Sequence, residues 1–434
     1  MTLTTHRVAD GIRLSHLRTD RFKTGVLTFT MTLPLSRDHI ARNQLLPSLL
    51  RRGTDRYPDM ASINRRLDEL YAACVEIRGS RIGKNLALIF SAEILDPLYI
   101  PDDTDVTDGV MEVIAQMLLH QKKNADGFGG DTVAKEIRFA TDSIRSEVNN
   151  TRGYALIRLA ELMRREDRDY PTLEESISDL EAIDGSILAK YHEELLATSP
   201  LEVFYVGSLS PEEITDRILR HFGEWNPTKP HRLIPPMAEP SAGYAEKTLP
   251  MPVSQGKLAM GFRTGVATGD ARFPVMLVLN ELFGGSAASK LFLHVREELS
   301  LCYYCSSAYN KNSGILSVSA GIESEKRHLA QTAILSQMEA IRTGEITEAE
   351  WNGAKTSLLN AYRQSYDNPF ELQAIYSHRI LFRIGETLEE TMDAIRGVTR
   401  EEVIALANEV TCDTVFFIEG TRKDGDGEEE DDEL

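Results

Sequence analysis

The sequence repeats itself once over most of its length. Residues 65–94 read RRLDELYAACVEIRGSRIGKNLALIFSAEI, and residues 293–322 read LHVREELSLCYYCSSAYNKNSGILSVSAGI. Both segments predict a helix followed by two strands joined by a turn, and they align without a gap. The ends repeat as well, because an amphipathic helix precedes each of two buried strands, at 203–207 (VFYVG) and 415–420 (VFFIEG). A two-fold repeat of this length indicates duplicated domains and excludes a short-period solenoid.

A proline-rich segment separates the two copies. Seven of the 17 prolines lie between residues 224 and 256. Proline removes an amide donor and blocks helix, so this segment should be extended and irregular. We therefore predict an N-terminal domain at 1–223, a linker at 224–256, a C-terminal domain at 257–421 and an acidic tail at 422–434.

The charge is strongly negative, and part of it is local. The formal net charge is −19, which argues against non-specific binding to nucleic acid, since such binding needs a positive surface. The segment 424–434 contains only acidic residues, two glycines and a final leucine. Such a run cannot bury a core, so we expect a disordered tail that serves in interaction or solubility, or is a plain solvated terminus.

Strand and helix patterns occur in blocks. Residues 25–33 alternate as a half-buried strand does, and 86–94 and 314–322 also predict strands. Long helical patterns cover 131–164 and 347–379, the second with Thr347 as a plausible N-cap. The predicted class is α+β, with two homologous halves, each a mostly antiparallel or mixed sheet covered by helices on one face.

The cysteine content and the lack of long apolar runs bear on where the protein is located in the cell. Four cysteines in 434 residues exclude a disulfide scaffold. The first 20 residues show no apolar signal core, and no apolar run is long enough to span a membrane. These features predict a cytoplasmic, multi-domain protein without a membrane anchor.

The histidines and cysteines give no metal pattern. No two of the ten histidines lie three, four or five residues apart, whereas a helical zinc site needs a pair at i and i+4. Cys302 and Cys305 form a C-x-x-C, but no second pair accompanies them. Because residues three apart on a strand point to opposite faces, we interpret both as packing cysteines rather than zinc ligands or a redox pair.

A glycine-rich turn lies between two predicted helices of the second half. Residues 283–290 read FGGSAASK, which does not have the spacing of a phosphate-binding Walker loop. Gly284, Gly285 and Ser286 either form a flexible turn or lie beside a bound peptide.

The segment that follows the glycine turn resembles a known family. Residues 291–298 read LFLHVREE and lead to Tyr303, seven residues after Arg296. This arrangement, the duplicated halves and the linker resemble the insulinase-like metallopeptidases, whose mitochondrial processing peptidases are one subgroup. The resemblance covers nearly the whole chain. Within the family, the chain is most similar to bacterial proteins associated with modification of elongation factor P.

The family's zinc motif is replaced in this chain. The family has His-x-x-Glu-His shortly before Gly-Thr, and Gly53-Thr54 matches that trailing signature. The resemblance then places Gln44, Pro47 and Ser48 at the positions of the two histidines and the glutamate, and Ser143 at the third ligand. Glutamine and serine are poor zinc ligands and proline cannot act as a base. Pro47 also suggests a kink or a helix start. We expect no cofactor in this chain.

The resemblance implies a division of labour between two chains. In one subgroup a catalytic subunit holds zinc, and its partner contributes an arginine and a tyrosine to a shared chamber. Arg296 and Tyr303 would then bind a peptide substrate in the active site of a homologous partner that carries His-x-x-Glu-His. The alternatives are a scaffold or peptide-binding protein without any proteolytic role, and a purely structural role for the pair, with Arg296 bonded to a neighbour such as Glu297.

Overall fold

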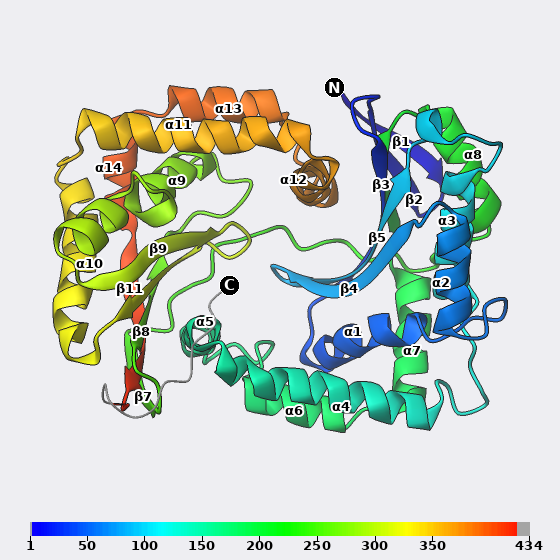
Figure 1. The fold of residues 1–434 in the computed structure, drawn as a ribbon, viewed down its shortest axis with the longest axis horizontal. Coiled ribbons are helices and arrows are strands. Elements are labelled where there is room, and N and C mark those ends of the chain that lie inside the picture. Colours follow the sequence, from blue (N-terminus) through cyan, green and yellow to red (C-terminus); the bar gives the residue numbers. More distant parts are fainter. Residues whose placement is uncertain (1, 423–434) are drawn as a thin grey trace. The chain divides into compact units, whose positions relative to one another are not determined.

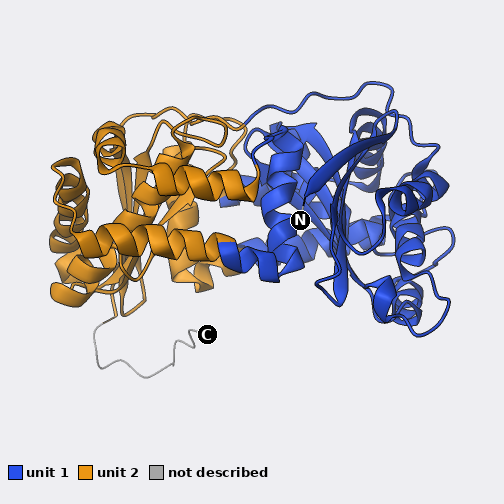
Figure 2. Cartoon of the chain, turned by 90° about the horizontal axis from the view of Figure 1, so that it is seen from above, with its two compact units in different colours: residues 1–144, 173–235, 363–386 blue, residues 145–172, 236–362, 387–434 orange. Residues whose placement is uncertain are grey.

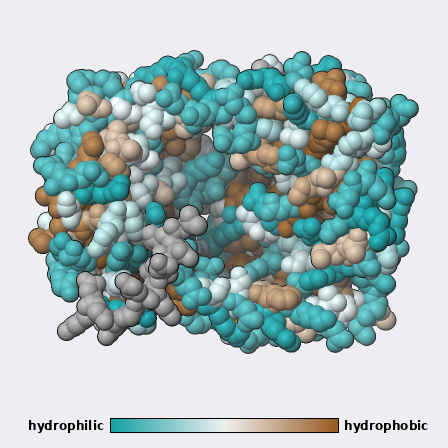
Figure 3. Space-filling view, viewed as in Figure 1, coloured by the Kyte–Doolittle hydropathy of each residue, from teal (hydrophilic) through white to brown (hydrophobic). Residues whose placement is uncertain are grey.

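The computed structural model describes residues 2–422 and contains two compact units, each with its own β-sheet (Figures 1 and 2). Unit 1 comprises residues 1–144, 173–235 and 363–386, and unit 2 comprises 145–172, 236–362 and the chain from 387 onward. The acidic segment 424–434 lies outside the described residues. Hydrophilic residues dominate the face drawn in Figure 3.

The sheet of unit 1 has six strands in the order β1-β2-β6-β3-β5-β4. Only β2 and β6 run parallel, and the other neighbours are antiparallel, so the sheet is mixed as predicted. Strand β4 pairs with β5 alone and forms one edge. The strands are β1 (Leu3–Ala9), β2 (Ile12–Arg18), β3 (Thr24–Pro34), β4 (Cys74–Ile82), β5 (Asn85–Leu95) and β6 (Leu201–Gly207).

The sheet of unit 2 has five strands in the order β7-β11-β8-β10-β9. Its β7 and β11 are parallel, and the remaining pairs are antiparallel. Strand β9 pairs with β10 alone and forms an edge, as β4 does in unit 1. The strands are β7 (Ala245–Met251), β8 (Gly256–Arg263), β9 (Cys302–Asn310), β10 (Ile315–Ile322) and β11 (Thr411–Gly420).

Most helices of each unit cover one face of its sheet and complete the apolar core there. In unit 1 the core joins the strands to α1, α3, α7 and α8, and in unit 2 it joins them to α9, α10 and α14. The helices of unit 1 are α1 (Arg37–Leu50), α2 (Met60–Glu69), α3 (Val106–Leu119), α4 (Gly130–Ser146), α6 (Leu173–Glu181), α7 (Gly185–Thr198) and α8 (Pro211–Phe222). Those of unit 2 are α9 (Phe273–Asn280), α10 (Arg327–Arg342), α11 (Glu348–Gln364), α13 (Leu388–Gly397) and α14 (Arg400–Glu409).

Each half of the sequence gives one helix to the unit built mainly from the other half. Helix α5 (Thr151–Met163) packs on β8 and β11, and α12 (Pro369–Phe382) packs on β3 and β6. Both lie on the face opposite the core helices: the side chain of Met163 lies against Gly261, and the Tyr376 ring lies 6.3 Å from the Phe204 ring. The units are therefore interleaved, whereas the boundaries drawn from the sequence describe contiguous halves.

The prediction of one unbroken helix in each half was wrong. Residues 131–164 form α4, a short 3-10 turn and α5, and residues 347–379 form α11, a 3-10 turn and most of α12. Asparagine ends each break, because Asn150 Oδ1 accepts the Gly153 amide at 2.9 Å and Asn368 Oδ1 accepts the Phe370 amide at 2.8 Å. Between residues 2 and 422, no helix combines the length and apolar character that crossing a membrane requires.

Candidate functional site

Helix α1 carries three of the four residues that the resemblance places at the family's metal-site positions. Gln44 is exposed, Ser48 is half-buried, and Pro47 is buried beneath them. The helix runs from Arg37 to Leu50, so the expected helix start at Pro47 was wrong. The residues at these positions offer a neutral amide, a hydroxyl and a ring without a proton-accepting group, so they cannot reproduce the zinc site.

Pro47 leaves one backbone carbonyl of α1 without its helical hydrogen bond. Proline has no amide to donate to the Asn43 carbonyl one turn earlier. That carbonyl faces Gly79 on β4, where an added Cβ would lie only 2.1 Å from the oxygen. The Asn43 side chain donates to the Ala87 carbonyl at 3.2 Å and accepts from the Tyr191 hydroxyl at 3.1 Å. Polar contacts thus fasten α1 to the sheet.

The residue at the fourth metal-site position, Ser143, lies on an exposed face of α4. Glu136 on the same helix is buried, and its carboxylate accepts from Arg52 Nε at 2.8 Å. It is therefore committed to an ion pair. Within residues 2–422, no three His, Cys, Asp or Glu side chains are grouped so as to hold a metal ion.

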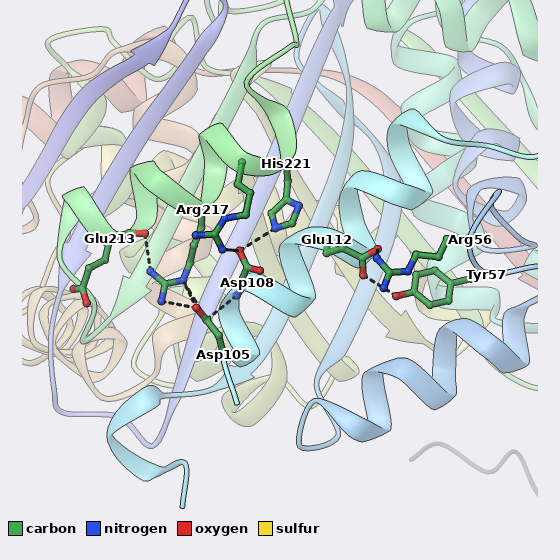
Figure 4. Close-up of polar contacts among 9 residues, drawn as sticks. Arg56, Tyr57, Asp105, Asp108, Glu112, Glu213, Arg217 and His221 are labelled. Carbon is green, nitrogen blue, oxygen red and sulfur yellow. Dashed lines mark hydrogen bonds and ion pairs between the residues drawn. The ribbon is translucent and has the colours of Figure 1, made fainter. Parts of the chain in front are cut away.

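The loop after α1 is held by a polar cluster on α3 (Figure 4). The Tyr57 hydroxyl donates to Glu112 at 2.7 Å, and Arg56 pairs with the same carboxylate at 2.9 Å. Burial and the Glu112 carboxylate raise the pKa of Tyr57 to about 12. Tyr57, which follows Gly53-Thr54 in the chain, therefore anchors the loop as a hydrogen-bond donor.

A second cluster in Figure 4 joins α3 to α8. Arg217 pairs with Asp105 at 2.7 Å, and His221 lies 2.9 Å from Asp108. Arg217 also donates to the backbone carbonyl of Glu213 at 2.7 Å. Every charged group here faces another protein group, so the cluster ties two helices together and offers no open position for a ligand.

The predicted substrate-binding pair lies around the start of β9 in unit 2. Arg296 is on the π-helical segment η4 (Leu291–Glu298), and Tyr303 is the second residue of β9. The Leu301 amide donates to the Val295 carbonyl at 3.2 Å, which folds the connection so that the pair flanks one turn. The Arg296 guanidinium lies 4.8 Å from the Phe292 ring centre and 3.6 Å from Glu297.

A β-bulge sets the direction of Tyr303. Ile322 and Gly321 on β10 pair with Cys302 and Tyr304, so Tyr303 is an extra residue on the edge strand. The Tyr303 side chain is 55% exposed, although its neighbour Cys302 is buried. The bulge therefore turns the phenol away from the core at the open edge of the sheet.

The bulge also corrects the prediction for the cysteines. Residues three apart should face opposite sides of a regular strand, but the extra residue restores Cys302 and Cys305 to the same face. Both are buried in the core of unit 2 as free thiols. Their expected burial is confirmed, and the expected opposite orientation was wrong.

The glycine turn packs behind β9. An added Cβ at Gly284 would lie 2.7 Å from the Ser307 amide nitrogen, so this buried glycine permits the close approach of η3 (Glu281–Gly285) and β9. Gly285 is exposed, and the Ser286 hydroxyl donates to the Glu281 carbonyl at 3.3 Å. Arg296, Tyr303 and the turn thus gather in unit 2, while Gln44, Pro47, Ser48 and Ser143 belong to unit 1.

A charged network beneath η4 was missed from the sequence. His294 Nδ1 lies 2.8 Å from Glu298, and its Nε2 lies 3.0 Å from Glu350, which also binds Lys290 at 2.9 Å. The hydrogen bond with Glu298, joined by the one with Glu350, raises the pKa of His294. Burial opposes ionisation of Glu350, but hydrogen bonds from Thr347, Lys290 and His294 lower its pKa to about 2. Only the i, i+4 spacing of His294 and Glu298 hinted at this network.

Comparison with known proteins supports one family. Residues 183–358 match the model described as "Peptidase M16 inactive domain". The chain is 28% identical to "Probable inactive metalloprotease YmfF" of Bacillus subtilis over 95% of this chain and 96% of that protein. It is 23% identical to "Uncharacterized zinc protease YmxG" of the same organism, over 56% of this chain and 58% of that protein.

A solved structure shares the whole fold. The crystal structure of a conserved protein from Enterococcus faecalis V583 matches with a TM-score of 0.88 and 25% sequence identity. The match covers 97% of this chain and 99% of that one. The fold of this chain is therefore similar to the fold of that structure.

Proposed function

We propose that this chain, an inactive homologue of the M16 metallopeptidases, is the substrate-binding subunit of a two-chain zinc peptidase. A homologous chain carrying His-x-x-Glu-His would hold the zinc, and this chain would contribute Arg296 and Tyr303 to that active site. The observation that carries the proposal is the exposed phenol of Tyr303, turned outward by the bulge in β9.

Both side chains suit peptide cleavage. A scissile carbonyl becomes an oxyanion as it is attacked, and a phenol can donate a hydrogen bond to that oxygen in the transition state. The Arg296 guanidinium can hold a peptide carbonyl or carboxylate in register before the reaction begins. Neither task requires a metal in this chain.

The open edge of β9 supports a peptide as the ligand. Edge strands present unpaired amide and carbonyl groups, and an extended peptide can pair with them as an added strand. Tyr303 lies on this edge and Arg296 flanks its first residue. A peptide lying along β9 would therefore pass both proposed contact residues.

The proposed partner is a homologue that retains the zinc motif, acting with this chain in the cytoplasm. Bacillus subtilis provides a precedent for two such chains in one organism, since one relative is named an inactive metalloprotease and another a zinc protease. A second copy of this chain would supply no His-x-x-Glu-His, so a self-paired dimer would serve only for binding.

A scaffold or peptide-binding protein without any role in proteolysis is the second candidate. It is favoured by the surroundings of Arg296, whose guanidinium already lies between the Phe292 ring and the Glu297 carboxylate. An arginine so placed can serve packing alone, and the scaffold function then needs only the open strand edge.

The test uses the chain co-expressed with an M16 homologue that carries the zinc motif, encoded in the same genome. Co-purification should yield a stable complex at micromolar concentration, with zinc found in the partner after the chains are separated. Tyr303→Phe keeps the ring and removes one donor, so turnover of a peptide should fall about 100- to 1000-fold, mainly in kcat.

The control is Tyr309→Phe on the same strand, whose hydroxyl donates to the Val266 carbonyl at 2.8 Å inside unit 2. It should leave kcat within about threefold of the unmodified complex. Two chains that never co-elute, or a Tyr303→Phe complex with unchanged turnover, would favour the scaffold function.

A further inference from the structure

Arg152, the second residue of α5, lies over the outer face of β9. Its guanidinium is 4.2 Å from the ring centre of Tyr304, and its Nη2 donates to the Ser306 hydroxyl at 3.3 Å. Tyr304 and Ser306 are two apart and share the strand face opposite the core. Helix α5, which the first half of the sequence gives to unit 2, therefore places the Arg152 guanidinium against the edge strand β9.

The Tyr304 ring beneath Arg152 lies on the backbone of the neighbouring strand. An added Cβ at Gly321 would lie 2.5 Å from a Tyr304 ring carbon, so the ring lies against bare backbone of β10. Lys257 Nζ is 5.7 Å from the centre of the same ring. The Tyr304 ring therefore contacts two cationic side chains. The cation–π interaction with the ring compensates each of them for the hydration that it loses there.

The guanidinium of Arg152 has no carboxylate partner among residues 2–422, and the side chain is exposed. Other arginines have one: Arg13, Arg37 and Arg217, for example, each pair with an acidic residue within 2.7 Å. The donors of Arg152 that do not face Ser306 remain available to a ligand. A forked set of N–H donors matches the two oxygens of a carboxylate.

The two edge strands differ in charge. Neither β9 nor β10 contains an acidic residue, and the sequence of β9 is CYYCSSAYN. The corresponding strands of unit 1 carry Glu76 and Glu93, which line a pocket of about 440 Å³ together with Arg78. Strands β9 and β10 therefore add no negative charge beside Arg152 and Lys257, whereas β4 and β5 carry charges of both signs.

We propose that the open edge of β9 binds extended peptides with acidic side chains, and that Arg152 receives a carboxylate of the peptide. The inference deepens the proposed function, on which it rests, by naming a substrate class. A peptide added along β9 projects alternate side chains onto the face that carries Arg152, Tyr304 and Ser306. Charge complementarity selects acidic side chains there, and the adjacent Tyr303 contacts the backbone.

The test measures binding to the full chain by fluorescence anisotropy. Three labelled dodecapeptides share one sequence except for four central positions, which are glutamate, glutamine or lysine. The glutamate peptide should bind at least about tenfold more tightly than the glutamine peptide, since a charge-assisted hydrogen bond is gained. Raising the ionic strength to about 1 M should remove most of this preference, because exposed charges are then screened.

Two variants test whether the preference for the glutamate peptide arises at the edge strand β9. Arg152→Gln should bring the affinities for the glutamate and glutamine peptides within about twofold of each other, mainly by weakening the glutamate peptide. The matched control is Arg78→Gln, an exposed arginine on the other edge strand β4, which should keep the full preference. Equal binding of all three peptides, or loss of the preference only with Arg78→Gln, would overturn the proposal.

The peptide-binding test and the turnover test can fail independently, so the substrate class and the subunit role are tested separately. If Tyr303→Phe lowers turnover in the two-chain complex but acidic peptides bind no better than neutral ones, the subunit role stands and the substrate class is wrong. If the acidic preference depends on Arg152 but Tyr303→Phe is silent, β9 binds peptides without assisting catalysis.

Discussion

The two edge strands, β4 and β9, occupy the same place in the sequence repeat and both begin with cysteine, yet they present different residues. In β4, Cys74 is exposed and Val75 is 2% exposed. In β9, Cys302 is 8% exposed and Tyr303 is 55% exposed. The register of β4 with β5 is continuous, whereas β9 carries the bulge at Tyr303.

The bulge at Tyr303 is therefore the difference between β4, an edge strand with a structural role, and β9, the candidate substrate-binding edge. Side chains alternate along a strand, so a one-residue bulge in the pairing exchanges the inner and outer faces on one side of it. Duplication supplied two similar strands, and the bulge gave only one of them an outward phenol. A local change in register can divide roles between the halves without altering the fold.

The exchanged helices differ as well. Helix α5 is secured by buried charges, since Arg263 pairs with Asp413 at 2.8 Å and donates to the Met163 carbonyl at 2.6 Å. The turn before α12 is held by an exposed pair, Arg21 and Asp367, at 3.0 Å. The buried pair of Arg263 and Asp413 joins β8 to β11, and the same arginine holds α5 through the Met163 carbonyl. Removing one partner of a buried ion pair is costly.

The largest effect is expected from Arg263→Met, which tests that difference. The change leaves Asp413 buried without its cation and should lower the free energy of unfolding of unit 2 by about 3–5 kcal/mol. Each unit contains one tryptophan, so urea unfolding followed by Trp351 fluorescence, in a Trp225→Phe background, reports unit 2. Arg21→Met, followed by Trp225, should cost under about 1 kcal/mol. Equal losses in the two units would contradict the comparison.

A second prediction concerns how each edge strand meets its covering helix. In unit 1 the glycine is on the strand, where Gly79 faces the Asn43 carbonyl, and in unit 2 it is on the helical side, where Gly284 faces Ser307. Gly79→Ala should cost about 1–3 kcal/mol, because backbone cannot yield to a Cβ at 2.1 Å. Gly130→Ala, where no atom lies within 4 Å, is the control and should be neutral or stabilising. Thermal unfolding measures both, and a neutral Gly79→Ala would show that α1 can move away from β4.

A third prediction sharpens the role of the β9 edge in the two-chain complex. Arg296→Ala should raise KM about tenfold and lower kcat no more than that, because positioning a carbonyl already acts in the ground state. Steady-state kinetics on one peptide gives both constants. Glu297→Gln, which removes the neighbouring charge at 3.6 Å, should change neither by more than about twofold. An effect of Arg296→Ala on kcat alone would assign the arginine to the transition state.

The smallest effect is a pH dependence confined to unit 2. The folded pKa of His294 is raised above 6.5, with Glu298, Glu350 and Lys290 facing the ring. The imidazolium therefore stabilises the fold below pH 6.5, and this contribution is lost as pH rises through the folded pKa. Because the side chain is partly exposed, the change should be at most about 1 kcal/mol. The stability of a His294→Gln variant should fall less across this range, and identical pH profiles would exclude the histidine as the cause.

Much of the architecture was readable from the residues. Apolar periodicity located β3, β5 and β10 within two residues, and the repeat established two halves with mixed sheets. The expected absence of a zinc site rests on the resemblance, which places Gln44, Pro47 and Ser48 at the motif positions, where these residue types are poor ligands or bases. The strands and the two halves follow from apolar periodicity and the internal repeat, which the sequence carries directly.

The tertiary structure decided what depends on pairing between distant segments. The exchange of α5 and α12 follows from breaks at Asn150 and Asn368, whose capping role appears only once the chain turns there. The outward direction of Tyr303 and the shared face of Cys302 and Cys305 follow from a bulge, which is defined by the register of β9 against β10. Register is a relation between two strands, so no single strand's sequence can specify it.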